Sequence, residues 1–82
     1  MLGKQKTPVD VVFGIVLRRV RKEANLSQEG LALEADLQRN YISLIELGTN
    51  QPTITTIFKL AKALKIKPNE LIGLVEQEMK IK

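Results

Sequence analysis

Two short segments with helical periodicity lie almost end to end in the middle of the 82-residue chain. Both carry apolar residues at the spacing of one helix face, which are Leu31, Ala32 and Ala35 in the first segment and Ile42 and Ile45 in the second. The connection Ala35-Asp36-Leu37 is too short for a loop that reverses the chain. The sequence therefore predicts two helices, at about 28–35 and 38–47, that meet at a steep angle.

Three further segments have the same periodicity. The expected helices run from about Pro8 to Ala24, from Ile54 to Leu64 and from Pro68 onward. The residues expected to face inward from the helix at 54–64 are Ile54, Ile57, Leu60, Ala61 and Leu64. Residues suited to helix ends flank the segments, namely the hydroxyls of Thr7, Ser27 and Thr53 and the glycine Gly48. No internal repeat, linker or strand signal appears, so the sequence predicts an all-α fold of five helices in one domain, residues 1–82.

The residue types that are missing narrow the possible chemistry. The chain contains no cysteine and no histidine, which excludes a disulfide scaffold, the usual zinc sites and the most common general base. We therefore expect no enzyme and no cofactor. The longest apolar stretch, Val11 to Leu17, is far shorter than the roughly 20 residues that cross a bilayer. With no signal peptide recognisable at the N-terminus, we expect a cytoplasmic protein.

The charge of the chain is unevenly distributed. The formal net charge of +4 favours a polyanionic partner such as nucleic acid. Residues 1–25 hold six basic and two acidic side chains, residues 26–58 one and four, and residues 59–82 six and three. If the protein binds DNA, the flanks must therefore supply most of the attraction for phosphates.

The two central helices, flanked by helices that close a core, describe a helix-turn-helix. The chain resembles the Xre-type helix-turn-helix family, which includes lambda-like phage repressors, Cro proteins and the controller proteins of restriction-modification systems. The resemblance runs from about Val12 to Ile72 and is carried by an ordered set of stretches: Phe13-Gly14, Leu17-Arg18, Leu26-Ser27-Gln28-Glu29, Leu31-Ala32, Tyr41-Ile42-Ser43, Ile45-Glu46, Pro52-Thr53, Lys59-Leu60-Ala61-Lys62-Ala63-Leu64 and Asn69-Glu70-Leu71. Asp36 and Lys65 stand where glycine is usual; aspartate tolerates a positive φ better than most residues.

The resemblance implies a five-helix, lambda-repressor-like DNA-binding domain whose third helix enters the major groove. Arginine can read guanine, asparagine can read adenine, and a leucine can touch a thymine methyl group. The base-contact candidates are Gln38, Arg39, Asn40, Ser43 and Leu44. Arg39 and Asn40 would also fit a solvated helix surface with no ligand.

The resemblance also places the start of the second helix against the sugar-phosphate backbone. The backbone-contact candidates are Arg18, Ser27, Gln28, Tyr41, Thr49, Asn50 and Gln51. Residues 49–51 lack basic side chains, so backbone N–H groups and neutral side chains would serve there. Arg18 would equally fit a solvent-exposed helix face that contacts no phosphate. Arg21, at the edge of the apolar stripe of the first helix, is expected to form a partly buried ion pair with Glu46.

The last helix has apolar residues on more than one face, and its end at 73–82 is a candidate for dimerisation. The candidate interface residues are Leu71, Leu74, Val75 and Met79; a frayed end with exposed apolar residues is the alternative. The sequence thus predicts a homodimeric regulator of transcription that binds double-stranded DNA at a roughly palindromic operator, in a prokaryotic cell or phage-infected host. No membrane partner and no small-molecule effector is expected. The alternative hypothesis is an antitoxin-type interaction protein that uses the same domain to bind a partner protein and to regulate its own expression.

Overall fold

The computed structural model of the protein describes residues 8–81. These residues form five helices and no strand: α1 (Val9–Glu23), α2 (Gln28–Ala35), α3 (Arg39–Glu46), α4 (Ile54–Leu64) and α5 (Pro68–Ile81). The all-α, five-helix prediction is confirmed, and each observed helix begins and ends within one residue of the predicted boundaries where both ends were predicted. Thr7, the expected cap of the first helix, lies outside the described residues.

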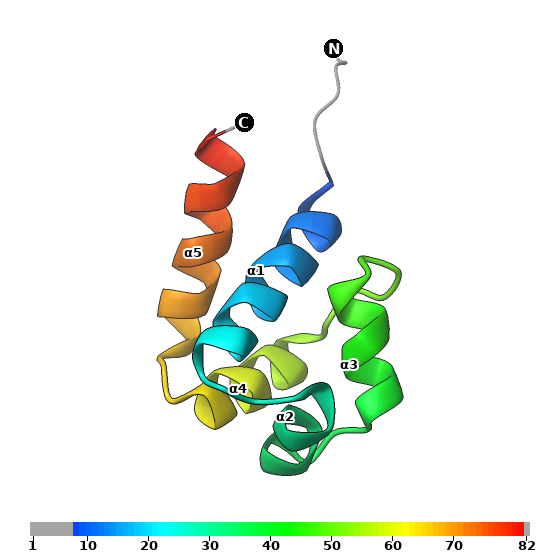
Figure 1. Cartoon of the computed structure of the whole chain (residues 1–82). Coiled ribbons are helices and arrows are strands. Elements are labelled where there is room, and N and C mark those ends of the chain that lie inside the picture. The colour runs from blue at the N-terminus through cyan, green and yellow to red at the C-terminus, as the bar shows by residue number, and fades with distance from the viewer. Residues whose placement is uncertain (1–7, 82) are drawn as a thin grey trace.

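α1 is the central element of the fold. It packs against α3 on one side and α5 on the other, while α2 packs on α3 and α4, and α4 packs on α5 (Figure 1). The core between them consists of buried apolar residues from all five helices: Val12, Phe13, Val16, Leu17, Leu31, Ala32, Ala35, Ile42, Ile45, Leu60, Ala61, Leu64, Leu71 and Val75. This core fixes the position of α3 relative to the rest of the chain.

Side-chain caps and left-handed residues set the ends of the short helices. The Ser27 hydroxyl accepts a hydrogen bond from the N–H of Gly30 at 2.9 Å, and Thr53 caps α4 in the same way through the N–H of Thr56 at 3.1 Å. Asp36 and Lys65 end α2 and α4 with φ values of 56° and 63°. Gly48 follows α3 with φ 80°, as the sequence predicts.

One residue of α4 lies on the opposite side from the prediction. Ile54 was expected to face inward, but it is 70% exposed. Thr56 is buried in this part of the helix instead, because its hydroxyl finds partners in Tyr41 and Thr53 and a satisfied polar group can be buried at low cost. The apolar stripe of α4 therefore starts about one turn later than expected.

The described residues contain neither a helix that is long and apolar enough to cross a membrane nor a group of three or more acidic residues that could hold a metal ion.

Candidate nucleic-acid interface

The first half of α3 presents polar side chains to solvent. Gln38, at the N-cap position, and Arg39 and Asn40, at the start of the helix, are exposed, while Ser43 and Leu44 one turn later are half-buried. The Gln38 side chain makes no capping hydrogen bond. On the opposite side of the helix, Ile42 and Ile45 are fully buried. The core therefore fixes the orientation of α3, and its polar edge is directed away from the protein.

An ion pair locks the end of α3 to α1. Arg21 Nε donates to Glu46 Oε2 at 2.6 Å and Arg21 Nη2 donates to Glu46 Oε1 at 3.1 Å, a two-point contact between a guanidinium and a carboxylate. The third donor, Nη1, binds the carbonyl of Leu26 at 2.9 Å. The two charged side chains are 9% and 4% exposed. The structure thus contains the ion pair that the sequence predicts, and it also ties α1 to the turn before α2.

Gln28 joins α2 to the same carboxylate. Its Nε2 donates to Glu46 Oε1 at 3.0 Å, so Glu46 accepts hydrogen bonds from α1 and α2 at once. One of the two amide N–H donors of Gln28 is therefore already used inside the protein. Only the second N–H of this amide remains for a contact with a DNA phosphate.

A short chain of hydroxyl groups links α3 to the start of α4. Tyr41 Oη lies 3.3 Å from Thr56 Oγ1, which lies 3.0 Å from Thr53 Oγ1. The sequence analysis missed Thr56, although its place three residues after the capping Thr53 is the spacing at which an N-cap and the first turn interact. Tyr41 is half-buried, and its hydroxyl, the predicted phosphate contact, has an internal partner in Thr56.

A cleft with a cationic edge lies where α1, α2 and α3 meet. Its volume is about 460 Å³, and its lining consists of Arg18, Arg21, Lys22, Gln28, Ser43, Glu46 and Leu47. Glu46 is paired with Arg21, so the exposed cations Arg18 and Lys22 dominate the electrostatics of the opening. This geometry brings the predicted backbone residues Arg18 and Gln28 close to the predicted base reader Ser43.

The sequence matches the helix-turn-helix family over residues 17–71. The chain belongs to the Xre-type helix-turn-helix family. It is 43% identical over 65 residues to the control protein C.BamHI of Bacillus amyloliquefaciens, covering 78% of this chain and 80% of that protein. It is 37% identical over 71 residues to the control protein C.MunI of Mycoplasma, covering 85% of this chain and 96% of that protein.

A solved structure agrees with this assignment. The restriction-modification controller protein C.AhdI from Aeromonas hydrophila superposes with a TM-score of 0.74 at 44% identity, covering 76% of this chain and 94% of that one. These relatives are control proteins, not enzymes. By family, this helix-turn-helix protein is a DNA-binding regulator of transcription, with α2 and α3 as the two helices of the motif.

The loop after α3 differs from the sequence expectation in one respect. The backbone N–H groups of Thr49 and Asn50 both donate to the carbonyl of Leu44, at 3.0 and 3.2 Å. They close the end of the helix and are not available to a phosphate, so only the side chains of these two residues remain for that contact. Gln51, the third candidate in the loop, lines a groove that also involves α5.

The interface predicted on α5 also needs correction. Leu71 is 0% exposed and Val75 is 4% exposed, so both belong to the core. Leu71 has no surface to offer a second copy, and Val75 reaches only the lining of a groove. Sequence periodicity did not separate them from their neighbours because both sides of α5 carry apolar residues. Leu74 is half-buried against the core, and only Met79 of the predicted set, at 36%, is exposed.

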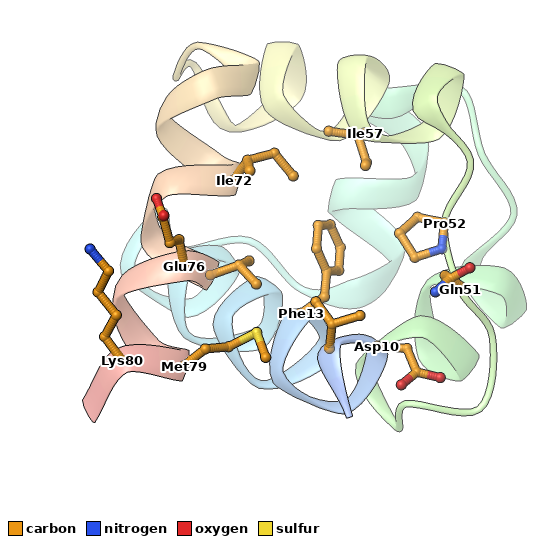
Figure 2. Close-up of a pocket in the computed structure, with 11 residues that line it drawn as sticks. Asp10, Phe13, Gln51, Pro52, Ile57, Ile72, Glu76, Met79 and Lys80 are labelled. Atoms are coloured by element: carbon orange, nitrogen blue, oxygen red, sulfur yellow. The ribbon is translucent and has the colours of Figure 1, made fainter. Parts of the chain in front are cut away.

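The accessible apolar surface of α5 faces a groove instead. Figure 2 shows Phe13 of α1, Ile57 of α4 and Ile72 of α5 pointing toward the same open space. The groove has a volume of about 730 Å³, and Pro52, Val75 and Met79 also line it. Glu76 and Lys80 stand at its edge, on the outer side of α5 (Figure 2).

Proposed function

We propose that this protein is a sequence-specific controller of transcription that binds a roughly palindromic operator in double-stranded DNA as a homodimer. The observation that carries the proposal is the exposed polar edge at the start of α3, which the core and the Arg21–Glu46–Gln28 network hold in a fixed orientation. The identity to control proteins such as C.BamHI and C.AhdI supports the controller type.

Base reading is assigned to Gln38, Arg39, Asn40, Ser43 and Leu44. The N-terminal residues of a recognition helix are those that reach base edges in the major groove. Arg39 has the donors for O6 and N7 of guanine, and Asn40 has the donor and acceptor for N6 and N7 of adenine. Neither side chain has a hydrogen-bond or ion-pair partner among residues 8–81, so binding a base displaces no internal contact.

Backbone contacts are assigned to the cleft edge and to the start of α2. Arg18 supplies a full positive charge, and the free amide donor of Gln28 lies beside the N-terminus of α2, where the helix dipole favours an anion. Ser27 keeps its hydroxyl proton for donation because the oxygen is the acceptor in the helix cap. The side chains of Tyr41, Thr49 and Asn50 complete the assigned phosphate surface. Gln51, the remaining candidate, also lines the groove that is assigned to the second copy.

The dimer interface, where a second copy of the chain would bind, is assigned to the groove between α1, α4 and α5. A two-fold contact places the same surface on both subunits, so the surface must complement itself. This groove has an apolar floor and opposite charges at its edge, since Glu76 and Lys80 lie four residues apart on α5. Ile72 and Met79 are the exposed apolar residues of α5 that such a contact would bury.

The proposal is tested by selecting bound duplexes from random DNA and measuring the affinity of variants for the selected site. Replacing Arg39 or Asn40 with alanine is expected to cost about 1–3 kcal/mol on the selected site and much less on a scrambled duplex. Lys65→Ala, which removes a positive charge at the turn between α4 and α5, is the matched control. Equal losses on both duplexes for Arg39→Ala and Asn40→Ala would show that α3 is not the reading helix.

A further inference from the structure

A second hollow lies where α4 meets α5. Its volume is about 470 Å³, and it is lined by Phe58, Lys59, Lys62, Ile66, Lys67 and Pro68. Phe58 is 59% exposed, although burying an aromatic ring is strongly favourable. None of these residues lines the α1–α5 groove or the cleft between α1, α2 and α3.

The surroundings of this hollow are cationic. Lys59, Lys62, Lys65 and Lys67 lie within nine positions, and the sequence has no acidic residue from 47 to 69. None of the four forms an ion pair within the described residues. The hollow thus combines an apolar floor with unpaired positive charge.

The opposite pattern occurs on the outer face of α2. Leu33 is 84% exposed, the highest value among the exposed large hydrophobic side chains. Glu29 lies one turn before it, Glu34 beside it and Asp36 three positions after it, all of them exposed. No ion pair within residues 8–81 includes these acidic residues. A protruding apolar side chain is here surrounded by negative charge.

Operator DNA does not account for either surface. The turn between α4 and α5 lies on the opposite side of the fold from α3 (Figure 1), so this turn is remote from DNA bound at α3. The acidic face of α2 repels phosphates. A contact of the lysine hollow with another lysine hollow is also unfavourable, because like charges would be brought together.

We propose that the outer face of α2 on one copy docks into the α4–α5 hollow of a second copy. Leu33 enters the apolar floor formed by Phe58, Ile66 and Pro68, while the acidic residues around it face the lysines at the edge. The two surfaces are complementary in charge, and each offers apolar side chains to the other.

The relative placement of the two surfaces permits a closed pair. Glu34 and Asp36 line a cleft of about 310 Å³ together with Lys59 and Lys62 of the same chain. The knob, which is the outer face of α2 with Leu33 at its centre, and the hollow are therefore neighbours on one side of the molecule. Two copies related by a two-fold axis make the contact twice, each supplying one knob and one hollow. This contact is distinct from the α1–α5 groove and does not depend on DNA binding.

The proposal is tested by sedimentation equilibrium of the full chain without DNA, from micromolar to millimolar concentration. The starting protein is the groove variant Ile72→Glu/Met79→Glu, so that association through the α1–α5 groove is suppressed. Leu33→Ala and Phe58→Ala are each expected to weaken the remaining self-association about tenfold or more. Leu47→Ala, another exposed leucine, is the matched control and leaves it unchanged.

The charges are tested by mixing. In the background of the groove variant Ile72→Glu/Met79→Glu, a Glu29→Lys/Glu34→Lys variant and a Lys59→Glu/Lys67→Glu variant are each expected to remain monomeric alone. The two are expected to associate with each other when mixed, because each then offers the charge that the other lacks. Added salt weakens the association. Glu23→Lys is the control for a charge change elsewhere. If the mixture remains monomeric, or if Leu33→Ala and Phe58→Ala leave association unchanged, the proposal is overturned; folding of every variant is checked by circular dichroism.

Discussion

Glu46 joins the end of α3 to both α1 and α2. Its carboxylate is 4% exposed and accepts hydrogen bonds from Arg21 and Gln28. Glu46→Ala leaves the Arg21 guanidinium buried without its anion, which costs about 3–5 kcal/mol of unfolding free energy. Urea unfolding measures this loss. The expectation fails if the unfolding midpoint of the Glu46→Ala variant is unchanged.

The second ion pair of the described residues serves as the control. Arg19 Nη1 lies 3.1 Å from Glu78 Oε1, and the Arg19 side chain is 43% exposed. Solvent screens a pair of this kind, so Arg19→Ala is expected to lower stability by less than about 1 kcal/mol. The comparison separates the effect of burial from that of charge, since both variants lose one ion pair between α1 and another helix.

At the scale of helices, replacing glycine with alanine is expected to have opposite effects at two positions. A Cβ atom on Gly14 of α1 would lie 2.4 Å from the carbonyl oxygen of Ile45 and 2.6 Å from that of Glu46, whereas a Cβ on Gly73 of α5 meets nothing within 4 Å. Gly14→Ala must separate α1 from α3 and is expected to cost at least about 1–3 kcal/mol. Gly73→Ala is expected to stabilise the protein by about 0.5–1 kcal/mol.

Thermal unfolding of the two variants checks this pair of expectations. Operator affinity adds an independent readout, because α1 positions α3 through this close approach. Gly14→Ala is therefore expected to weaken operator binding as well as folding, and Gly73→Ala to leave binding unchanged. A stable Gly14→Ala variant with normal affinity would contradict the close packing of α1 on α3.

The helices of this chain were predictable because their signals are local. Ser27, Thr53 and Gly48 end or begin helices through bonds to residues within one turn, so the sequence alone indicates them. The exposure of Ile54 and the burial of Leu71 and Val75 depend on which elements pack against them. The same is true of the Gln28–Glu46 bond, which joins residues 18 positions apart; periodicity carries no information on such contacts.

At the scale of the whole molecule, the proposed operator complex requires a dimer through the α1–α5 groove. Ile72→Glu together with Met79→Glu places charge on its accessible apolar surface and is expected to weaken the groove dimer about tenfold or more, as measured by sedimentation equilibrium. Both residues are exposed in the single chain, so the fold should persist. Leu47→Glu together with Ile54→Glu, at two exposed apolar residues outside the groove, is the matched control. An unchanged association constant for the groove variant would exclude this surface as the dimer interface.

Dimerisation through this groove also has a consequence on DNA. Two recognition helices in a two-fold dimer read half-sites about one helical turn apart, roughly 34–36 Å. The duplexes selected from random DNA should therefore contain two inverted half-sites with this separation. Selected sites with a single, unrepeated half-site would contradict a dimeric reader.

The uneven charge of the molecule predicts how its DNA affinity depends on salt. The affinity falls as salt rises, and each phosphate contact from a basic side chain contributes about −0.9 to the slope of log K against log salt. Arg18→Ala is expected to weaken binding to operator and scrambled duplexes alike and to reduce the magnitude of the slope by about 0.9 for each subunit, while Lys65→Ala changes neither. Because Arg39 is the single basic residue from 26 to 58, the slope of the wild-type protein is expected to be shallow for its net charge. Titrations at several salt concentrations measure this, and a slope that Arg18→Ala leaves unchanged would remove Arg18 from the phosphate surface.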